Sequence, residues 1–200
     1  MNIYHGTKFY QSVYELSELP ESLAEVAFLG RSNSGKSSTI NTLVQQTGLA
    51  KTSKTPGRTQ LINFFTIIPN KFLVDLPGYG FAKVSSKIKK HWGTSLTLYL
   101  EQREPLRGVV LIMDIRHPLK EQDWQTINWL THHKIPVHIL LSKADKLSKS
   151  AAQTTLNKVL DATCHQPLVS VQVFSSLKAQ GPQELSEKLN TWLEINSLSK

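Results

Sequence analysis

The sequence predicts one α/β domain in three layers, with a six-stranded, mostly parallel sheet between helices on both faces. Apolar runs alternate with amphipathic helical patterns through most of the 200 residues, which is typical of a parallel sheet covered by helices. The run Gly108–Met113 is uniformly apolar, as expected of a strand buried on both faces. A turn at Pro69-Asn70 separates the runs Gln60–Ile67 and Lys71–Asp75, so we expect a hairpin with one antiparallel strand.

The order of the elements suggests where a ligand binds. We expect strands at Leu23–Leu29, Gln60–Ile67, Lys71–Asp75, Gly108–Met113, Val137–Leu141 and Leu168–Phe174. We expect helices at Lys36–Gln46, Ser86–Gln102, Lys120–His133, Ser150–Thr163 and Pro182–Ile195. Residues 1–22 form an N-terminal extension in this scheme, and residues 23–195 form the core of the domain. Ligands of such sheets bind outside the carboxyl ends of the strands, and the residues found there are Gly30, Asp75, Asp114, Ser142 and Ser175.

The composition excludes several classes of protein. Hydrophobic residues make up 40% and charged residues 19% of the chain, which is ordinary for a globular domain and excludes a disordered or coiled-coil protein. The single cysteine, Cys164, excludes an intramolecular disulfide and a cysteine-based zinc site. No run approaches the roughly 18 apolar residues of a membrane helix, and no signal-peptide pattern opens the chain. We therefore expect a cytoplasmic protein.

The net charge of +8 is concentrated in one part of the chain. Between Lys51 and Arg107 the sequence has ten basic residues and three acidic ones, a local charge of +7. A one-sided excess of this kind favours a polyanionic partner, of which RNA is the commonest in a cytosol. The alternative is a lysine-rich face that is merely solvated.

A phosphate-binding loop follows the first predicted strand. Residues 30–37 (GRSNSGKS) match the pattern G-x-x-x-x-G-K-[ST] between a strand and a helix, which is the context that the pattern requires. The loop's backbone N–H groups and the positive end of the helix dipole would hold phosphate oxygens. Lys36 would reach the β- and γ-phosphates, and the Ser37 hydroxyl would bind Mg²⁺. The expected contacts are Gly30, Arg31, Ser32, Asn33, Ser34, Gly35, Lys36 and Ser37.

Two further segments complete the predicted phosphate and magnesium site. In Asp75-Leu76-Pro77-Gly78, the carboxylate would hold a magnesium-bound water and the Gly78 N–H would contact the γ-phosphate. The threonine-rich loop 52–60 would supply a second hydroxyl ligand when the γ-phosphate is present. Thr59 is the predicted ligand, Thr55 is the competing one, and a plain surface loop is the alternative. We expect nucleotide contacts from Gly57, Arg58, Thr59, Gln60 and Leu61, and from Asp75, Leu76, Pro77 and Gly78.

The base-binding residues predict guanine rather than adenine. Ser142-Lys143-Ala144-Asp145 follows a predicted strand, and a carboxylate there can accept hydrogen bonds from guanine N1–H and from its exocyclic amine. Adenine lacks this pair of donors, so the Asp145 carboxylate would be left unpaired. The Lys143 stem would lie along the base. The segment Phe174-Ser175-Ser176 would offer backbone N–H groups to guanine O6.

In this order, the motifs resemble those of translation-factor-class GTPases, and in particular of the EngB (YihA/YsxC) family among the TrmE–Era–EngA–YihA–septin-like P-loop GTPases. The resemblance covers about residues 9–195 and rests on segments 25–38 (EVAFLGRSNSGKSS), 55–60 (TPGRTQ), 73–80 (LVDLPGYG) and 142–147 (SKADKL). It implies a G domain that binds GTP or GDP with Mg²⁺, and Ser37 and Thr59 as metal ligands. It also implies a role in maturation of the large ribosomal subunit and a link to cell division and septation. Ser142 departs from the family's usual Thr or Asn but keeps a hydroxyl.

The segment after Gly78 predicts slow hydrolysis by the protein alone. Tyr79 occupies the place of the glutamine that orients water in small signalling GTPases. Asn33 resembles the P-loop asparagine of potassium-stimulated GTPases, so K⁺ or a ribosomal partner would supply the missing charge. The predicted catalytic residues are Lys36, Asn33, Thr59 and Gly78.

The expected partner is ribosomal RNA, which Lys83, Lys87, Lys89 and Lys90 would contact. We expect a monomer that binds neither DNA nor a membrane. The alternatives are a nucleotide-gated binding module with negligible turnover and an ATP-dependent phosphotransferase.

Overall fold

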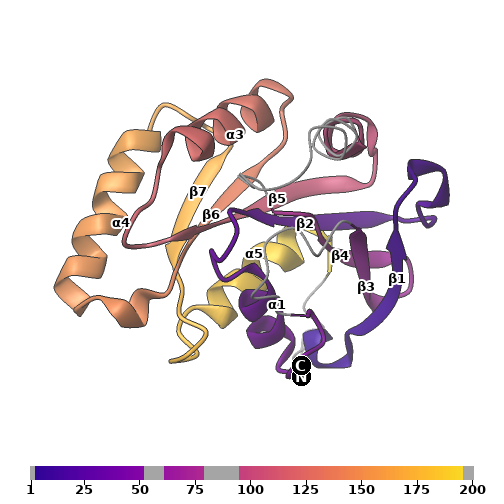
Figure 1. The fold of residues 1–200 in the computed structure, drawn as a ribbon, viewed down its shortest axis with the longest axis horizontal. Coiled ribbons are helices and arrows are strands. Elements are labelled where there is room, and N and C mark those ends of the chain that lie inside the picture. Colours follow the sequence, from indigo (N-terminus) through magenta and orange to yellow (C-terminus); the bar gives the residue numbers. More distant parts are fainter. Residues whose placement is uncertain (1–2, 52–60, 79–94, 196–200) are drawn as a thin grey trace.

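The computed structural model describes residues 3–51, 61–78 and 95–195. In these residues, one seven-stranded sheet runs through the molecule in the order β1-β3-β4-β2-β5-β6-β7 (Figure 1). The strands are β1 (Lys8–Val13), β2 (Ala24–Gly30), β3 (Ile62–Ile68), β4 (Lys71–Asp75), β5 (Leu106–Asp114), β6 (Val137–Ser142) and β7 (Val169–Val173). Strand β3 is antiparallel to both of its neighbours, whereas the pairs of β2, β4, β5, β6 and β7 are parallel. The predicted fold class, with its one antiparallel strand, is confirmed.

Helices cover the two faces of the sheet, as Figure 1 shows. On one face lie α3 (Glu121–His132) and α4 (Lys149–Thr163), and on the other lie α1 (Lys36–Val44) and α5 (Pro182–Trp192). The described residues also form the 3-10 turns η1 (Ile3–Gly6), η2 (Leu16–Glu18) and η3 (Ala144–Lys146). Residues 95–102 are helical, and the rest of the helix predicted at 86–102 lies outside the described residues. No helix of the described segments is long and apolar enough to cross a membrane.

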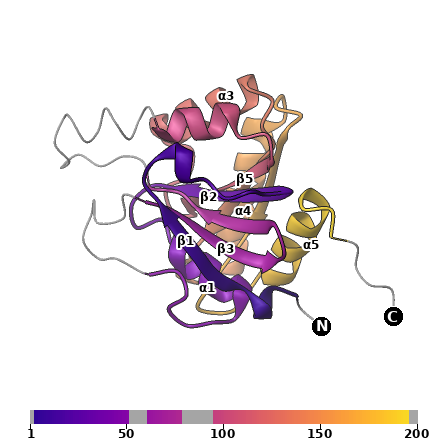
Figure 2. The same ribbon diagram turned by 90° about the vertical axis from the view of Figure 1, so that its right-hand side faces the viewer.

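The sheet has seven strands instead of the predicted six because β1 pairs with β3 at the sheet edge (Figure 2). The segment Lys8–Val13 does not alternate between buried and exposed positions, since Phe9 and Tyr10 are both 53% exposed. The pairing register shifts between Phe9 and Gln11, and such a bulge disrupts the period of two by which a strand is recognised in a sequence. Part of the expected N-terminal extension is thus a strand of the sheet.

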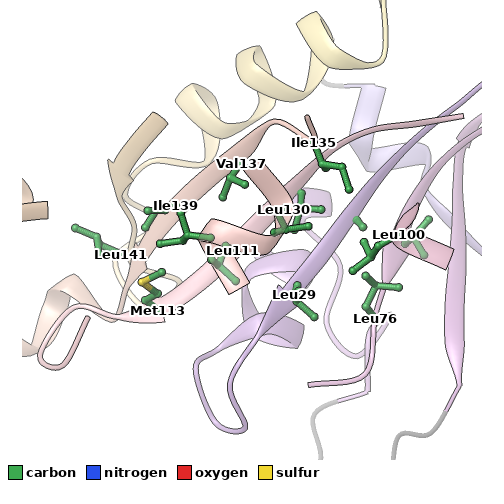
Figure 3. Packing of buried hydrophobic residues seen from close by; sticks show 14 of the residues in the cluster. Leu29, Leu76, Leu100, Leu111, Met113, Leu130, Ile135, Val137, Ile139 and Leu141 are labelled. Carbon is green, nitrogen blue, oxygen red and sulfur yellow. The ribbon is translucent and has the colours of Figure 1, made fainter. Parts of the chain in front are cut away.

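Two apolar layers hold the sheet between its helices. Along β5 the side chains alternate: Leu111 and Met113 face α3 and α4, and Val110 and Ile112 face α1 and α5. All four are fully buried, and Figure 3 shows Leu111 and Met113 among the leucine, isoleucine and valine side chains of the first layer. Burial of each such side chain stabilises the fold by about 1.5–3 kcal/mol.

The carboxyl ends of the parallel strands meet at one edge of the sheet. Gly30, Asp75, Asp114 and Ser142 are the last residues of β2, β4, β5 and β6, and Ser175 lies just beyond β7. The five positions selected from the sequence therefore lie on the same edge.

Candidate nucleotide-binding site

The phosphate loop turns tightly between β2 and α1. Asn33 and Gly35 have positive φ angles of 62° and 102°, and the second is accessible mainly to glycine. A Cβ atom on Gly30 would lie 2.6 Å from Ser34 Oγ and 2.7 Å from the Ile112 carbonyl oxygen, so only glycine fits there. Since α1 begins at Lys36, the loop's N–H groups and the positive end of the helix dipole come together, which suits an anion.

Lys36 and Asp75 form an ion pair at the end of the neighbouring strands β2 and β4. Their side chains are only 12% and 4% exposed, respectively. The parallel pairing of β2 with β4 brings the predicted phosphate-binding lysine to the predicted magnesium-binding carboxylate. Both would exchange this contact for new partners when a nucleotide and a metal bind.

Ser37 and Asp75 provide the hard oxygen donors that Mg²⁺ prefers. Ser37 follows Lys36 in the first turn of α1 and is half-buried. No cluster of three or more His, Cys, Asp or Glu side chains occurs within the described ranges. A Mg²⁺ ion that keeps several waters and phosphate oxygens needs only one or two protein ligands, so this donor set fits magnesium.

The loop after β6 packs directly on the phosphate loop. The Ser142 hydroxyl lies within donating distance of the Ser34 carbonyl oxygen, at 2.5 Å, and of the Met113 carbonyl oxygen, at 3.0 Å. Lys143 donates from Nζ to the Asn33 carbonyl oxygen at 2.6 Å. The backbone of Lys143 is left-handed, with φ 59°. The hydroxyl that Ser142 retains therefore joins the predicted base-binding loop to the phosphate loop.

Asp145 is oriented by the segment after β7. The Ser175 hydroxyl donates to Asp145 Oδ1 at 2.7 Å, and itself accepts a hydrogen bond from the Lys178 N–H at 3.2 Å. The hydrogen bond from Ser175 lowers the pKa of Asp145 below its ordinary value. The N–H of Ala144 donates to the carbonyl oxygen of the buried Phe174 at 3.1 Å, which fixes one segment against the other. An ionised carboxylate with this orientation is an acceptor for a base that presents two N–H donors.

The structure adds contacts around the site that the sequence did not predict. Arg116 donates to Asp114 from Nε at 2.9 Å and from Nη2 at 2.6 Å. Lys143 Nζ lies 3.1 Å from Asp114 Oδ2, the oxygen that also accepts from Arg116 Nη2. The Arg31 side chain lies against the start of α3, where its Nε is 3.2 Å from Oδ1 of the buried Asp123. From the sequence, Asp114 was placed at a strand end and Asp114-Ile-Arg116 was part of the family resemblance, but neither residue was assigned a role in the site.

The remaining predicted contacts lie around this edge or outside the described residues. Leu76, Pro77 and Gly78 follow Asp75 directly, and the buried Leu76 donates its N–H to the Phe28 carbonyl oxygen at 3.1 Å. Ser32 is half-buried in the phosphate loop, Ser176 follows Ser175, and Leu61 immediately precedes β3. The predicted residues outside the described ranges are Thr55, Gly57, Arg58, Thr59, Gln60, Tyr79, Lys83, Lys87, Lys89 and Lys90.

Comparison with known proteins gives matches along nearly the whole chain. Residues 25–143, more than half of the chain, match a family described as "50S ribosome-binding GTPase". A relative from Nitrosomonas europaea, named "Probable GTP-binding protein EngB", is 51% identical over 199 residues, covering 98% of this chain and 90% of the relative. A relative of the same name from Thiobacillus denitrificans is 54% identical over 185 residues, covering 92% and 90% of the two chains.

Solved structures with low sequence identity share the fold. The crystal structure of a probable GTP-binding protein engB has a TM-score of 0.66 at 19% identity, covering 86% of this chain and 99% of its own. The structure of a bacterial selenocysteine-specific elongation factor has a TM-score of 0.61 at 19% identity, covering 90% of this chain and 30% of the factor. At these identities the structures support the architecture alone.

Proposed function

Since the chain belongs to the EngB family of GTP-binding proteins, we propose that it hydrolyses GTP and acts as a nucleotide switch in assembly of the large ribosomal subunit. One observation carries the guanine part of this proposal. Ser175 holds the Asp145 carboxylate at 2.7 Å, while Lys143 ties the same loop to the phosphate loop at 2.6 Å. A single nucleotide can therefore contact both loops at once.

The bound nucleotide would use the two loops in different ways. Asp145 accepts hydrogen bonds from guanine N1–H and the exocyclic amine, and the Lys143 stem covers the base. Backbone N–H groups of the segment Gly30–Ser37 hold the phosphates, and Lys36 leaves Asp75 for the β- and γ-phosphates. Ser37, a water on Asp75 and Thr59 would hold Mg²⁺, which neutralises charge that develops on the phosphate oxygens.

Hydrolysis of GTP needs a water placed in line with the γ-phosphate. The proposed groups around that phosphate are Lys36, the Gly78 N–H, Thr59 and Asn33. Tyr79 cannot orient the water as a glutamine side chain would, which favours slow turnover by the protein alone. The exposed side chain of Asn33 offers an amide oxygen to K⁺, which would add positive charge beside the reacting phosphate.

The proposed partner is the large ribosomal subunit or its precursor. The matching family is described as a "50S ribosome-binding GTPase". The local charge of +7 between Lys51 and Arg107 suits a contact with ribosomal RNA. We further propose that the protein is a cytoplasmic monomer and that its contribution to cell division and septation follows from this assembly role.

Turnover measurements test the switch. We expect GTP hydrolysis to be faster in KCl than in NaCl and faster still with large-subunit precursors, and the Asn33→Ala variant to lose the potassium effect. Equal rates in both salts would remove K⁺ from the mechanism. Absence of single turnover even with precursor particles would instead favour a nucleotide-gated binding module.

Co-sedimentation tests the ribosomal partner separately. Charge reversal at Lys87, Lys89 and Lys90 should weaken binding to large-subunit particles and reduce its dependence on salt, because fewer counterions are released on binding. Unchanged co-sedimentation and salt dependence would place the RNA contact elsewhere on the protein.

A further inference from the structure

The segment from Asp114 to Asp123 contacts both the phosphate loop (residues 30–37) and the base-binding loop (residues 142–145). It begins at the last residue of β5, passes through a turn in which the His117 N–H donates to the Asp114 carbonyl oxygen at 2.9 Å, and ends in the first turn of α3. Its Ile115 is buried, and its N–H donates to the Ser142 carbonyl oxygen at 3.0 Å. Backbone hydrogen bonds thus hold the start of this segment at the end of the sheet.

Asp114, at the start of the segment, contacts the base-binding loop. The Arg116 guanidinium donates two hydrogen bonds to the Asp114 carboxylate, from Nε to Oδ1 at 2.9 Å and from Nη2 to Oδ2 at 2.6 Å. The Arg116 backbone N–H also donates to Oδ1, at 3.1 Å. Hydrogen bonds from Arg116 hold the pKa of Asp114 well below its usual range, so the carboxylate is charged at neutral pH. Its Oδ2 lies 3.1 Å from Lys143 Nζ, which also donates to the Asn33 carbonyl oxygen at 2.6 Å.

His117 and Asp123, later in the segment, contact the phosphate loop. Arg31 donates from Nη2 to the His117 carbonyl oxygen at 2.9 Å, and its Nε pairs with Asp123 at 3.2 Å. Asp123 is fully buried and accepts a hydrogen bond from the Lys120 N–H at 2.9 Å, which caps the start of α3. The phosphate loop is therefore joined to the same segment through the His117 carbonyl oxygen and Asp123.

We propose that Asp114 and Arg116 are positioning residues for nucleotide binding, which hold Lys143 so that the base-binding and phosphate loops keep a fixed separation. A free lysine side chain has many rotamers, and its ordering costs affinity when a ligand binds. Lys143 is ordered in advance because its ammonium group lies between Asp114 and Asn33. Arg116 keeps the carboxylate in place with a bidentate contact, which a single point charge cannot reproduce.

A double-mutant cycle tests this role. The Kd of GDP is measured for the wild type, Asp114→Asn, Lys143→Met and the double variant. If Asp114 acts through Lys143, Asp114→Asn raises the Kd about tenfold in the wild-type background and less than about twofold in the Lys143→Met background. A merely structural role of Asp114 predicts the same rise in both backgrounds, and that result would overturn the proposal.

Arg116 gives an independent measurement if the Lys143 variants fold poorly. Arg116→Met is expected to raise the Kd of GDP, and Arg116→Lys to restore part of the affinity, because lysine retains the charge and one donor. Arg107→Met is the matched control, since this exposed arginine lies near the opposite end of β5, where it donates to the Leu23 carbonyl oxygen. Equal effects at positions 107 and 116, or no effect at 116, would contradict the assignment.

This inference rests on the proposed binding of a guanine nucleotide to both loops, but the two can fail separately. A wild-type protein without affinity for GDP would overturn both. A wild-type protein that binds GDP, with additive effects in the cycle, would overturn the positioning role alone. The unfolding free energy of each nucleotide-free variant is measured alongside, and a loss of affinity that follows the loss of stability counts against the proposal.

Discussion

The ammonium group of Lys36 is ion-paired with the carboxylate of Asp75 at the end of two adjacent strands. The proposed phosphate ligand and the proposed magnesium ligand thus neutralise each other in a site from which water is largely excluded. Both groups must find replacement partners when a nucleotide binds, and a nucleotide with its metal provides an anion for one and a cation for the other. Binding of the nucleotide and the metal is therefore expected to be coupled.

The Asp75→Asn variant tests this coupling. The amide removes the negative charge, so Lys36 becomes available to phosphates, and the magnesium-bound water loses its acceptor. We expect GDP to bind at least as tightly as to the wild type when EDTA removes the metal, and Mg²⁺ to give little further affinity. Asp161→Asn, an exposed position on α4, is the control. An Asp75→Asn variant with the full magnesium effect would show that Asp75 does not serve the metal.

Ser175→Ala tests how the base is recognised. The substitution removes the 2.7 Å hydrogen bond that orients Asp145, and a hydrogen bond to a charged group is worth about 1.5–3 kcal/mol. We expect weaker GDP binding and a smaller preference for GDP over IDP, which lacks the exocyclic amine. Ser17→Ala, at an exposed serine of η2, should leave both unchanged. A retained preference in Ser175→Ala would mean that Asp145 needs no support from Ser175.

A buried charge network at the other end of β2 predicts a stability effect. Glu25 is fully buried, and it accepts hydrogen bonds from Arg103 Nε at 3.0 and 3.1 Å and from the Tyr99 hydroxyl at 2.6 Å. Arg103→Met leaves the carboxylate buried without its cation, so we expect the free energy of unfolding in urea to fall by about 3 kcal/mol. Arg107→Met, at an exposed arginine of β5, should change it little. Equal losses would mean that the Glu25–Arg103 pair adds no specific stability.

His138 predicts how stability depends on pH. Burial lowers its pKa from 6.5 to about 4, so below pH 6.5 the unfolded chain binds a proton that the folded protein does not. Stability is then complete above pH 6.5 and falls by roughly 3 kcal/mol as the pH decreases to 4. In His138→Gln this part of the pH dependence should disappear, whereas His132→Gln, at an exposed position, should retain it. An unchanged slope between pH 6.5 and 4 in His138→Gln would assign the effect to other groups.

Much of this architecture is encoded by local patterns. The six predicted strands and the described helices agree with the structure to within a few residues, because the strand segments are rich in apolar residues and glycines or prolines lie near several of their ends. The positions of Asp75, Ser142 and Ser175 at one edge follow from strand order alone.

Other features depend on contacts that no local pattern encodes. Strand β1 escapes prediction because its bulge and its exposed Phe9 and Tyr10 remove the alternation. The Asp114–Arg116 pair has a sequence separation of only two residues, but its significance depends on Lys143, which β6 brings alongside. Similarly, Arg31 meets Asp123 only because β2 and β5 are neighbours in the sheet.

Calorimetric titration of the protein with GDP and then with ADP, both with Mg²⁺, tests most directly whether Asp145 and Lys36 hold a guanine nucleotide. The expected result is a saturable heat for one GDP per chain and an ADP affinity lower by a factor of about 100 or more, because adenine leaves the Asp145 carboxylate unpaired. If no heat of GDP binding is detected, or if the two nucleotides bind with equal affinity, the assignment of Asp145 and Lys36 to a guanine-nucleotide site is contradicted.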